Sequence, residues 1–439
     1  MICLWRCRAA REDATAEAMA VVLETKTTSS WLDDCLEQFR CLGPECEEIC
    51  CHGWQISVDA PTLVALRALD DADVRTTLDQ SVILLPGART PMQAGVLRLR
   101  ADGDCPFLRE DRLCSIQAAH GEAPMPVGCR VYPRVHHRVD GVMRSALSLS
   151  CPEAARVVLG GAGECAEPRL AERVEDCLDS VLKELPERGA RLSIYWPLRR
   201  VHEAILHEPQ HPFAERMERV GLLAQKLDAA PEEDAAAALR EFCRKGREKM
   251  PGEAGAVAQQ EISEKLLGFL MAATVAALRF AAGNARFCAL TERVLQGLKI
   301  ASDAGDLAGL RARCERLRRE SLEPFLRRHP EWMERFLWNE MVRTNYPFWA
   351  SGAEDARLRN GTDSSSACAA FARLALEWAW VRLYLLGLVG TDELTEENAA
   401  LSVQSLSRAV FSRTKEWDAL GAAMTQMMKV VPLHELLRI

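Results

Sequence analysis

The sequence has few aromatic residues, no excess of positive charge and no uninterrupted apolar run. Phe, Trp and Tyr make up 6% of its 439 residues, and 55 Lys and Arg stand against 63 Asp and Glu, for a formal charge of −8. Such a chain has no global basic field to attract nucleic acid or anionic lipid, so neither partner is expected. With 48% hydrophobic and 27% charged residues, the composition is that of a globular protein.

Signals for membrane insertion or secretion are missing as well. The most apolar stretch, 369–389, is long enough to span a bilayer, but Arg373, Glu377 and Arg382 interrupt it. Charges at that density are costly in lipid, so we predict a buried helix in a helical bundle. Residues 1–8 lack the apolar stretch and cleavage site of a secretory signal. The expectation is a cytoplasmic protein with no membrane partner.

Cysteine, in contrast, is abundant, with 17 residues. Cytoplasmic cysteines rarely persist as disulfides, so metal ligation or redox chemistry is the leading explanation. Eight cysteines fall between positions 41 and 151, where even spreading would place about four. They form two groups, first Cys41, Cys46, Cys50 and Cys51, and then Cys105, Cys114, Cys129 and Cys151.

The spacing of these eight cysteines predicts a metal site without naming the metal. Thiolates select zinc, copper(I) or iron–sulfur clusters, commonly with four thiolates per site. The spacing matches neither a zinc finger nor a ferredoxin, and Gly53 stands where a Cys-x3-Cys-x2-Cys run would need its third thiol. Buried structural thiols are the alternative, and they are the favoured interpretation for Cys243, Cys288, Cys314 and Cys368. Five cysteines stay unassigned: Cys3, Cys7, Cys35, Cys165 and Cys177.

Local patterns predict short elements in the first part of the chain and long helices afterwards. Asp59 is expected to cap a helix ending near Leu69, residues 96–100 alternate like a strand, and Asp140-Gly141 predicts a hairpin turn. Apolar spacing near 3 and 4 predicts helices over 261–280, 331–343, 369–388 and 401–410.

The predicted fold class is mainly α: a Cys-rich mixed N-terminal module with short strands around a metal cluster, followed by a larger α-helical domain. We place an N-terminal extension at 1–18, the Cys-rich module at 19–177 and the helical domain at 178–439. Met19 is a candidate natural start.

Five ordered segments resemble the flagellin lysine-N-methylase family, whose N-terminal part is similar to zinc- or iron-chelating cysteine-cluster domains. The resemblance covers about Phe39 to Leu159, and a weaker similarity covers Phe336 to Trp349. The five segments are Phe39–Trp54, Cys105–Leu108, Leu113–Gln117, Cys129–Arg134 and Leu147–Arg156.

This resemblance implies a bacterial cytoplasmic enzyme that transfers methyl groups from S-adenosylmethionine to lysines of flagellin. It also implies a cluster, 4Fe-4S with zinc as the alternative, bound by the eight cysteines, without saying which four bind iron. A rival hypothesis is a non-catalytic Zn- or Fe-chelating module fused to a helical protein-interaction domain.

The sequence shows no clear cofactor loop and only weak catalytic candidates. Val157–Gly163 is glycine-rich, but a helix capped near Ser150 and ended by glycine explains it better than a nucleotide loop. Trp338, Tyr346 and Trp349 could cradle a cationic centre, although core packing is the favoured interpretation of these aromatics. His52 and the pair His136-His137 could act as ligands or bases, with structural roles favoured.

Overall fold

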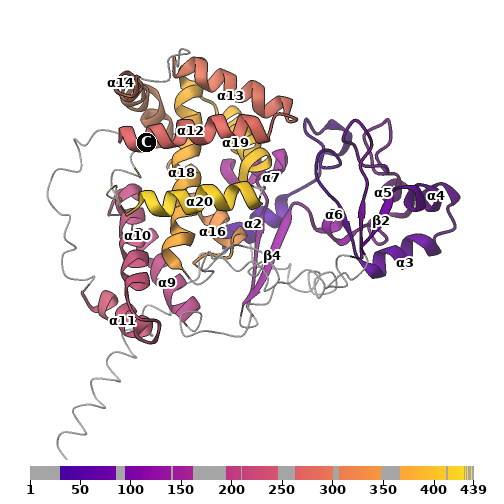
Figure 1. Cartoon of the computed structure of the whole chain (residues 1–439), viewed down its shortest axis with the longest axis horizontal. Coiled ribbons are helices and arrows are strands. Elements are labelled where there is room, and N and C mark those ends of the chain that lie inside the picture. The colour runs from indigo at the N-terminus through magenta and orange to yellow at the C-terminus, as the bar shows by residue number, and fades with distance from the viewer. Residues whose placement is uncertain are drawn as a thin grey trace, which may run out of the picture. The chain divides into compact units, whose positions relative to one another are not determined.

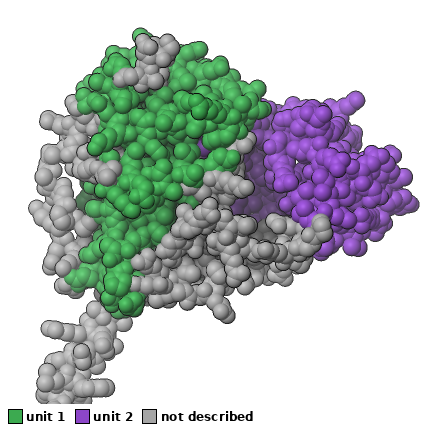
Figure 2. All heavy atoms as spheres, viewed as in Figure 1, with its two compact units in different colours: residues 1–30, 185–394, 413–439 green, residues 31–184, 395–412 purple. Residues whose placement is uncertain are grey.

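The computed structural model describes most of the chain in two compact units (Figure 2). Unit 1 comprises residues 1–30, 185–394 and 413–439, and unit 2 comprises residues 31–184 and 395–412. The residues described are 30–85, 94–139, 142–161, 194–208, 210–245, 263–299, 306–347, 366–411 and 414–429, with Val431, Leu433 and Leu437. The predicted extension 1–18, Met19, Cys3, Cys7, Cys165 and Cys177 lie outside them.

Unit 1 is built from helices, which agrees with the predicted mainly α class. The helices with the long α18 (Ala367–Val389) in unit 1 are α9, α10, α11, α12, α13, α14, α15, α16 and α20, with α11 beyond α10 at the lower left of Figure 1. Their bounds are Tyr195–Leu206, Phe213–Ala229, Ala235–Lys245, Glu264–Phe280, Ala285–Gly297, Leu307–Leu317, Glu323–Arg328, Trp332–Arg343 and Thr414–Met427. The 3-10 turn η4 (Glu232–Asp234) precedes α11, and the π-helical turn η6 (Arg318–Leu322) joins α14 to α15.

Helix α18 has apolar residues on every face, and every face is buried. It packs against α10, α13, α14, α16 and α20, and residues 370–388 are all buried. Two of its three charged side chains have partners of opposite charge inside the protein: Glu377 accepts a hydrogen bond from Arg343 at 3.5 Å, and Arg382 donates to Glu323 at 3.3 Å. The predicted buried bundle helix is confirmed. No helix in the described part of the chain is long and apolar enough to cross a membrane.

Unit 2 contains the short strands expected of the N-terminal module. Strands β1 (Ser57–Val58), β3 (Gly95–Leu97) and β2 (Val82–Leu84) form an antiparallel sheet in the order β1-β3-β2. Strands β4 (Arg134–Val139) and β5 (Val142–Leu147) pair in the predicted hairpin. The sheet packs in a core that includes Val58, Leu66, Leu78, Cys105 and Phe107.

Short helices complete unit 2. They are α2, η1, α3, α4, α5, α6, α7, α19 and the π-helical η7, with bounds Ser30–Gln38, Gly43–Glu45, Ala60–Ala68, Ala72–Ser81, Ser115–His120, Val127–Val131, Pro152–Gly160, Glu396–Leu406 and Ser407–Phe411. The cap at Asp59 is confirmed, since its Oδ1 accepts from the backbone N–H of Thr62 at 2.8 Å.

The glycine-rich stretch after residue 156 is helical, as the sequence predicts. Helix α7 runs to Gly160, and Gly161, with φ of +51°, ends it. The expected cap at Ser150 is wrong, because the helix begins one residue later, with Cys151 at the cap position and no side-chain cap. The Ser150 hydroxyl instead lies 3.0 Å from the Tyr132 hydroxyl. A nucleotide loop has no strand to follow here.

Candidate metal site in the cysteine-rich unit

The cysteines of unit 2 are carried by loops and helix starts that backbone hydrogen bonds draw together. The N–H of Cys105 donates to the carbonyl of Cys51 at 2.8 Å, and His52 forms a β-bridge with Asp104. A second bridge pairs Leu108 with Cys114. Segments about 50 residues apart in sequence therefore present their thiols to one region of unit 2.

Five thiols share this region: Cys51, Cys105, Cys114 and Cys129 pack at one apolar core, and Cys50 hydrogen-bonds with Cys51. A hydrogen bond with Cys51 lowers the pKa of Cys50 to about 7, and Arg408 acts in the same direction. Burial raises the pKa of Cys105 to about 11, and the neighbouring Cys114 adds to this shift. Burial also raises the pKa of Cys129, followed by the charges of Cys105, Cys50 and Cys114. Like charges so close disfavour several thiolates at once unless a cation joins them.

The remaining motif cysteines border the same group. Burial raises the pKa of Cys151 to about 12, and Cys46 and Cys50 contribute. The pKa of Cys46 is raised by burial, with smaller contributions from Cys41 and Cys50, while its thiol donates to the carbonyl of Glu48 at 3.4 Å. All eight motif cysteines thus lie in unit 2, and Cys46 and Cys151 interact electrostatically with Cys50.

The donor chemistry of this neighbourhood fits a soft metal or cluster. The 13 cysteines within the described ranges are free thiols. Their side chains do not form a closed coordination shell: among the described residues, no group of three or more His, Cys, Asp or Glu side chains is arranged to hold a metal ion. The predicted metal cluster is therefore not shown, and the eight cysteines stay candidate ligands.

Arginines hold the backbone around the thiols. Arg100 donates through Nη2 to the carbonyl of Cys105 at 2.8 Å, and Arg112 donates to the carbonyl of Cys46. Arg408 donates to the carbonyls of Ile49 and His52 at 3.0 and 2.8 Å. The Cys105 carbonyl also accepts from the backbone N–H of Leu108 at 3.0 Å, so the guanidinium of Arg100 adds a second hydrogen bond there.

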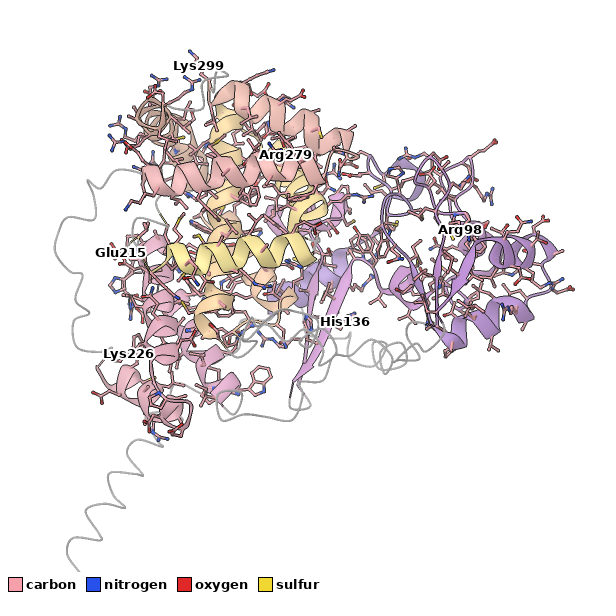
Figure 3. All side chains as sticks on the ribbon, viewed as in Figure 1. Arg98, His136, Glu215, Lys226, Arg279 and Lys299 are labelled. Carbon is pink, nitrogen blue, oxygen red and sulfur yellow. The ribbon has the colours of Figure 1, made fainter. Side chains whose placement is uncertain are left out.

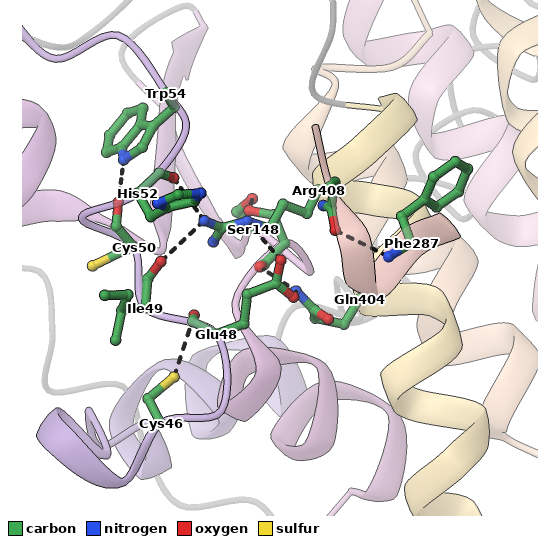
Figure 4. A network of polar contacts seen from close by, with 12 residues as sticks. Cys46, Glu48, Ile49, Cys50, His52, Trp54, Ser148, Phe287, Gln404 and Arg408 are labelled. Atoms are coloured by element: carbon green, nitrogen blue, oxygen red, sulfur yellow. Dashed lines mark hydrogen bonds and ion pairs between the residues drawn. The ribbon is translucent and has the colours of Figure 1, made fainter. Parts of the chain in front are cut away.

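Gln404 of helix α19 and Arg408 of the π-helical turn η7, both far along the chain, contact the segments that carry the cysteines (Figure 4). Gln404 donates through Nε2 to Glu48 Oε2 at 2.8 Å and to the carbonyl of Ser150 at 2.9 Å. Nε of Arg408 lies 2.9 Å from Glu48 Oε1. Sequence reasoning missed both residues, because a helical pattern over 401–410 carries no sign of a partner about 350 positions away.

The histidines near the cysteines have protein partners. Nδ1 of His52 lies 2.7 Å from Asp104 Oδ1, in an exposed pair. His136, on the hairpin (Figure 3), lies 2.7 Å from the Ser145 hydroxyl, and burial lowers its pKa to about 4. His137 is buried on the same strand. A structural role suffices for the two hairpin histidines.

The aromatic candidates lie in unit 1. Trp338 is buried and stacks on His207 with ring centroids 4.7 Å apart. Tyr346 is buried with its ring 5.3 Å from that of His202, and its carbonyl accepts from Arg199 at 2.6 Å. Trp349 lies outside the described residues. Packing accounts for the positions of Trp338 and Tyr346.

His202 is another residue that the sequence did not single out. Its ring is fully buried on α9, and neither ring nitrogen has a hydrogen-bond partner in the described part of unit 1. Burial lowers the pKa of His202 to about 3, and Arg199 adds to this effect. His202 is therefore neutral at physiological pH.

A thiol-rich unit joined to a helical unit defines a cysteine-cluster protein with a large helical domain. Comparison with known proteins is more specific. The model of the FliB lysine N-methylase C-terminal domain matches residues 199–431, more than half of the chain. The chain belongs to the FliB lysine N-methylase family.

Individual relatives agree with this assignment. The flagellar biosynthetic protein FliU of Salmonella muenchen is 34% identical over 157 residues, which cover 36% of this chain and 90% of that protein. Lysine-N-methylases of Salmonella typhimurium and Salmonella choleraesuis are 37% identical over 123 and 122 residues, or 28% of this chain and 30% of each relative. The matched region thus spans less than a third of these methylases. No solved structure is significantly similar to the chain.

Proposed function

We propose that this protein is an S-adenosylmethionine-dependent lysine N-methyltransferase that acts on flagellin in the cytoplasm and holds an iron–sulfur cluster through cysteines of unit 2. The observation that carries the proposal is the gathering of all eight motif cysteines in one unit of a chain that belongs to the FliB family. Two of the relatives are named lysine-N-methylases, and a third is named a flagellar biosynthetic protein.

The reaction requires a neutral lysine amine. Its lone pair attacks the methyl carbon of the sulfonium, the carbon–sulfur bond breaks, and S-adenosylhomocysteine leaves while the amine loses a proton. A desolvated pocket favours the neutral amine, and alignment with the methyl group lowers the barrier. The protein must therefore exclude water from the lysine and offer a group or a path that accepts the proton.

The cluster fits the donor set of unit 2. Four of the eight candidate ligands would hold it, and Arg100, Arg112 and Arg408 would orient the loops. The candidates are Cys41, Cys46, Cys50, Cys51, Cys105, Cys114, Cys129 and Cys151. When bound, a cluster supplies a rigid, redox-active centre that crosslinks these loops.

Methylation is tested by mass spectrometry. Protein purified without oxygen, loaded with iron and sulfide and incubated with S-adenosylmethionine should raise the mass of flagellin in steps of about 14 Da, since methylation adds one CH2 and keeps the lysine charge. Flagellin of unchanged mass, with protein verified to contain iron and sulfide, would refute the proposal.

The rival function is a non-catalytic metal-chelating module with a helical interaction domain, which the same thiol chemistry supports. It predicts bound metal without affinity for S-adenosylmethionine. Isothermal titration calorimetry of the metal-loaded protein separates the two functions, because only the methyltransferase releases or absorbs heat with the methyl donor.

A further inference from the structure

We infer that residues 395–411 form a clamp that fixes the cysteine loop 46–52, with Arg408 and Gln404 as its positioning residues. The C-terminal family domain, matched over 199–431, would then complete a site whose candidate ligands all lie before residue 152. The inference rests on the proposed metal site for its purpose, while the clamp itself rests on contacts within unit 2.

Arg408 grips the loop on both sides of the adjacent cysteines. Its guanidinium donates to the carbonyl of Ile49 at 3.0 Å, just before Cys50, and to the carbonyl of His52 at 2.8 Å, just after Cys51. Figure 4 shows this side chain between the two backbone segments. A rigid planar guanidinium with five donors can serve several acceptors in fixed directions, whereas the ammonium of a lysine is a single point with three donors on a flexible stem.

Glu48 forms an ion pair with Arg408. Its carboxylate lies 2.9 Å from Arg408 Nε, and only 14–15% of either side chain is exposed to solvent. An ion pair this well shielded is screened less by salt than a surface pair, and its hydrogen bonds are charge-assisted. The loop is therefore held at its backbone and at a side chain.

Gln404 ties the two groups of cysteines together. It is fully buried, and its Nε2 donates both to Glu48, two residues before Cys50, and to the carbonyl of Ser150, next to Cys151. One amide thus fixes the distance between loop 46–52 and the start of α7. A buried amide that lost these acceptors would cost free energy, so the contacts are mutually dependent.

The clamp residues lie on helix α19 and the π-helical turn η7, which are well anchored. Asn398 and Thr395 form a reciprocal cap at the start of α19, and α19 packs along α7. The turn widens into the π-helix η7 at Ser407–Phe411, where Ala409, Val410 and Phe411 are buried. Arg408 is therefore anchored by a packed π-helical turn, a feature often found at functional sites.

Thiol reactivity tests the clamp without any metal. In metal-free full-length protein, Arg408→Ala and Gln404→Met should speed alkylation of Cys51 by about 10-fold or more, because each variant loses hydrogen bonds that hold the loop. Cys51 is the readout because loss of Arg408 also raises the pKa of Cys50, which by itself slows alkylation of Cys50. Arg408→Lys should fall between Arg408→Ala and the wild type, because one ammonium cannot replace the guanidinium. Mass spectrometry of timed samples follows each cysteine separately.

Metal affinity is the second readout. Residues that orient ligands commonly affect metal affinity by about 10–100-fold, so Arg408→Ala should weaken iron binding in that range and alter the visible absorption of the loaded protein. Arg67→Ala is the control: Arg67 lies on the same unit in an exposed pair with Asp79, and its loss should change neither readout.

Wild-type alkylation rates and iron affinity in both Arg408→Ala and Gln404→Met would overturn the inference. Circular dichroism checks that each variant folds. If Arg408→Ala does not fold, the alkylation rates and iron affinities of Gln404→Met and Arg408→Lys test the inference. A wild-type protein that binds metal but does not methylate flagellin would refute the proposed function, whereas the alkylation rates would still test the clamp.

Discussion

His202 shows how a single buried side chain links structure to pH. Its pKa of about 3 lies below the value near 6.5 of an exposed histidine, so the native state stays neutral where the unfolded state becomes protonated. The contribution of His202 to the free energy of unfolding is fully present above pH 6.5 and is lost as the pH falls toward 3. Arg199 is the charged group that contributes to the shift.

Replacing His202 by Leu should reduce the acid sensitivity of unfolding. Between pH 7.5 and 5.5 the free energy of unfolding of the wild type should fall by about 1 kcal/mol because of His202. The His202→Leu variant should not show this part of the decrease. Urea unfolding at both pH values gives the two differences. Equal pH dependence in wild type and variant would show that His202 does not titrate as its burial implies.

Among single residues, the cysteines could be found from the sequence, but their supports could not. Cys46, Cys50 and Cys105 stand out by number and spacing, because thiols are rare and chemically distinctive. Gln404 and Arg408 do not, because glutamine and arginine are common on helices and most of their acceptors here are backbone carbonyls. Contacts with carbonyls leave no pattern in the sequence.

Among the elements, α13 and α18 approach closely through glycines. A Cβ atom at Gly297 would overlap the backbone oxygen of Gly387 and come within 3.3 Å of the Cα of Gly390. Backbone cannot move aside as a flexible side chain can. The pair of helices therefore depends on the absence of a side chain at this crossing.

Gly297→Ala should lower the free energy of unfolding by about 3 kcal/mol, the upper part of the usual range for overpacking. Gly283→Ala is the matched control, because a Cβ there meets no atom within 4 Å, and it should change stability by less than about 0.5 kcal/mol. Denaturant titration of both variants makes the comparison. Similar stability for the two would contradict the packing described for α13 and α18.

Helix positions were predictable where the apolar period is long, and harder to predict where local geometry decides. The predicted 331–343 and 369–388 correspond to α16 and α18 within two residues. The predicted 401–410 corresponds to α19, which begins at Glu396, and to the π-helical η7. A widened turn has the same composition as an α-helix, so periodicity alone cannot reveal it.

For the whole molecule, the chain is not divided in simple sequence order. The predicted boundary at 177/178 lies outside the described residues, and residues 395–411, far along the chain, belong to unit 2. The sequence resemblance was carried by residues 39–159, whereas the family model matches 199–431. Long-range packing of α19 on α7 unites these two parts, and no local pattern encodes it.

Replacing 395–412 with a Gly-Ser linker of equal length should therefore affect unit 2 selectively. Ala154, Ala155 and Val158 of α7 are fully buried and would lose the covering helix. Hydrogen exchange of the amides of α7 should become much faster, because local opening would no longer expose packed apolar surface. Unchanged protection of α7 would mean that α19 is dispensable for unit 2.

Iron and acid-labile sulfide, measured in protein purified without oxygen, test most directly whether the eight cysteines of unit 2 hold an iron–sulfur cluster. We expect a brown protein with about four iron and four sulfide per chain, the content of one 4Fe-4S cluster. Colourless protein containing zinc and no sulfide would contradict this assignment.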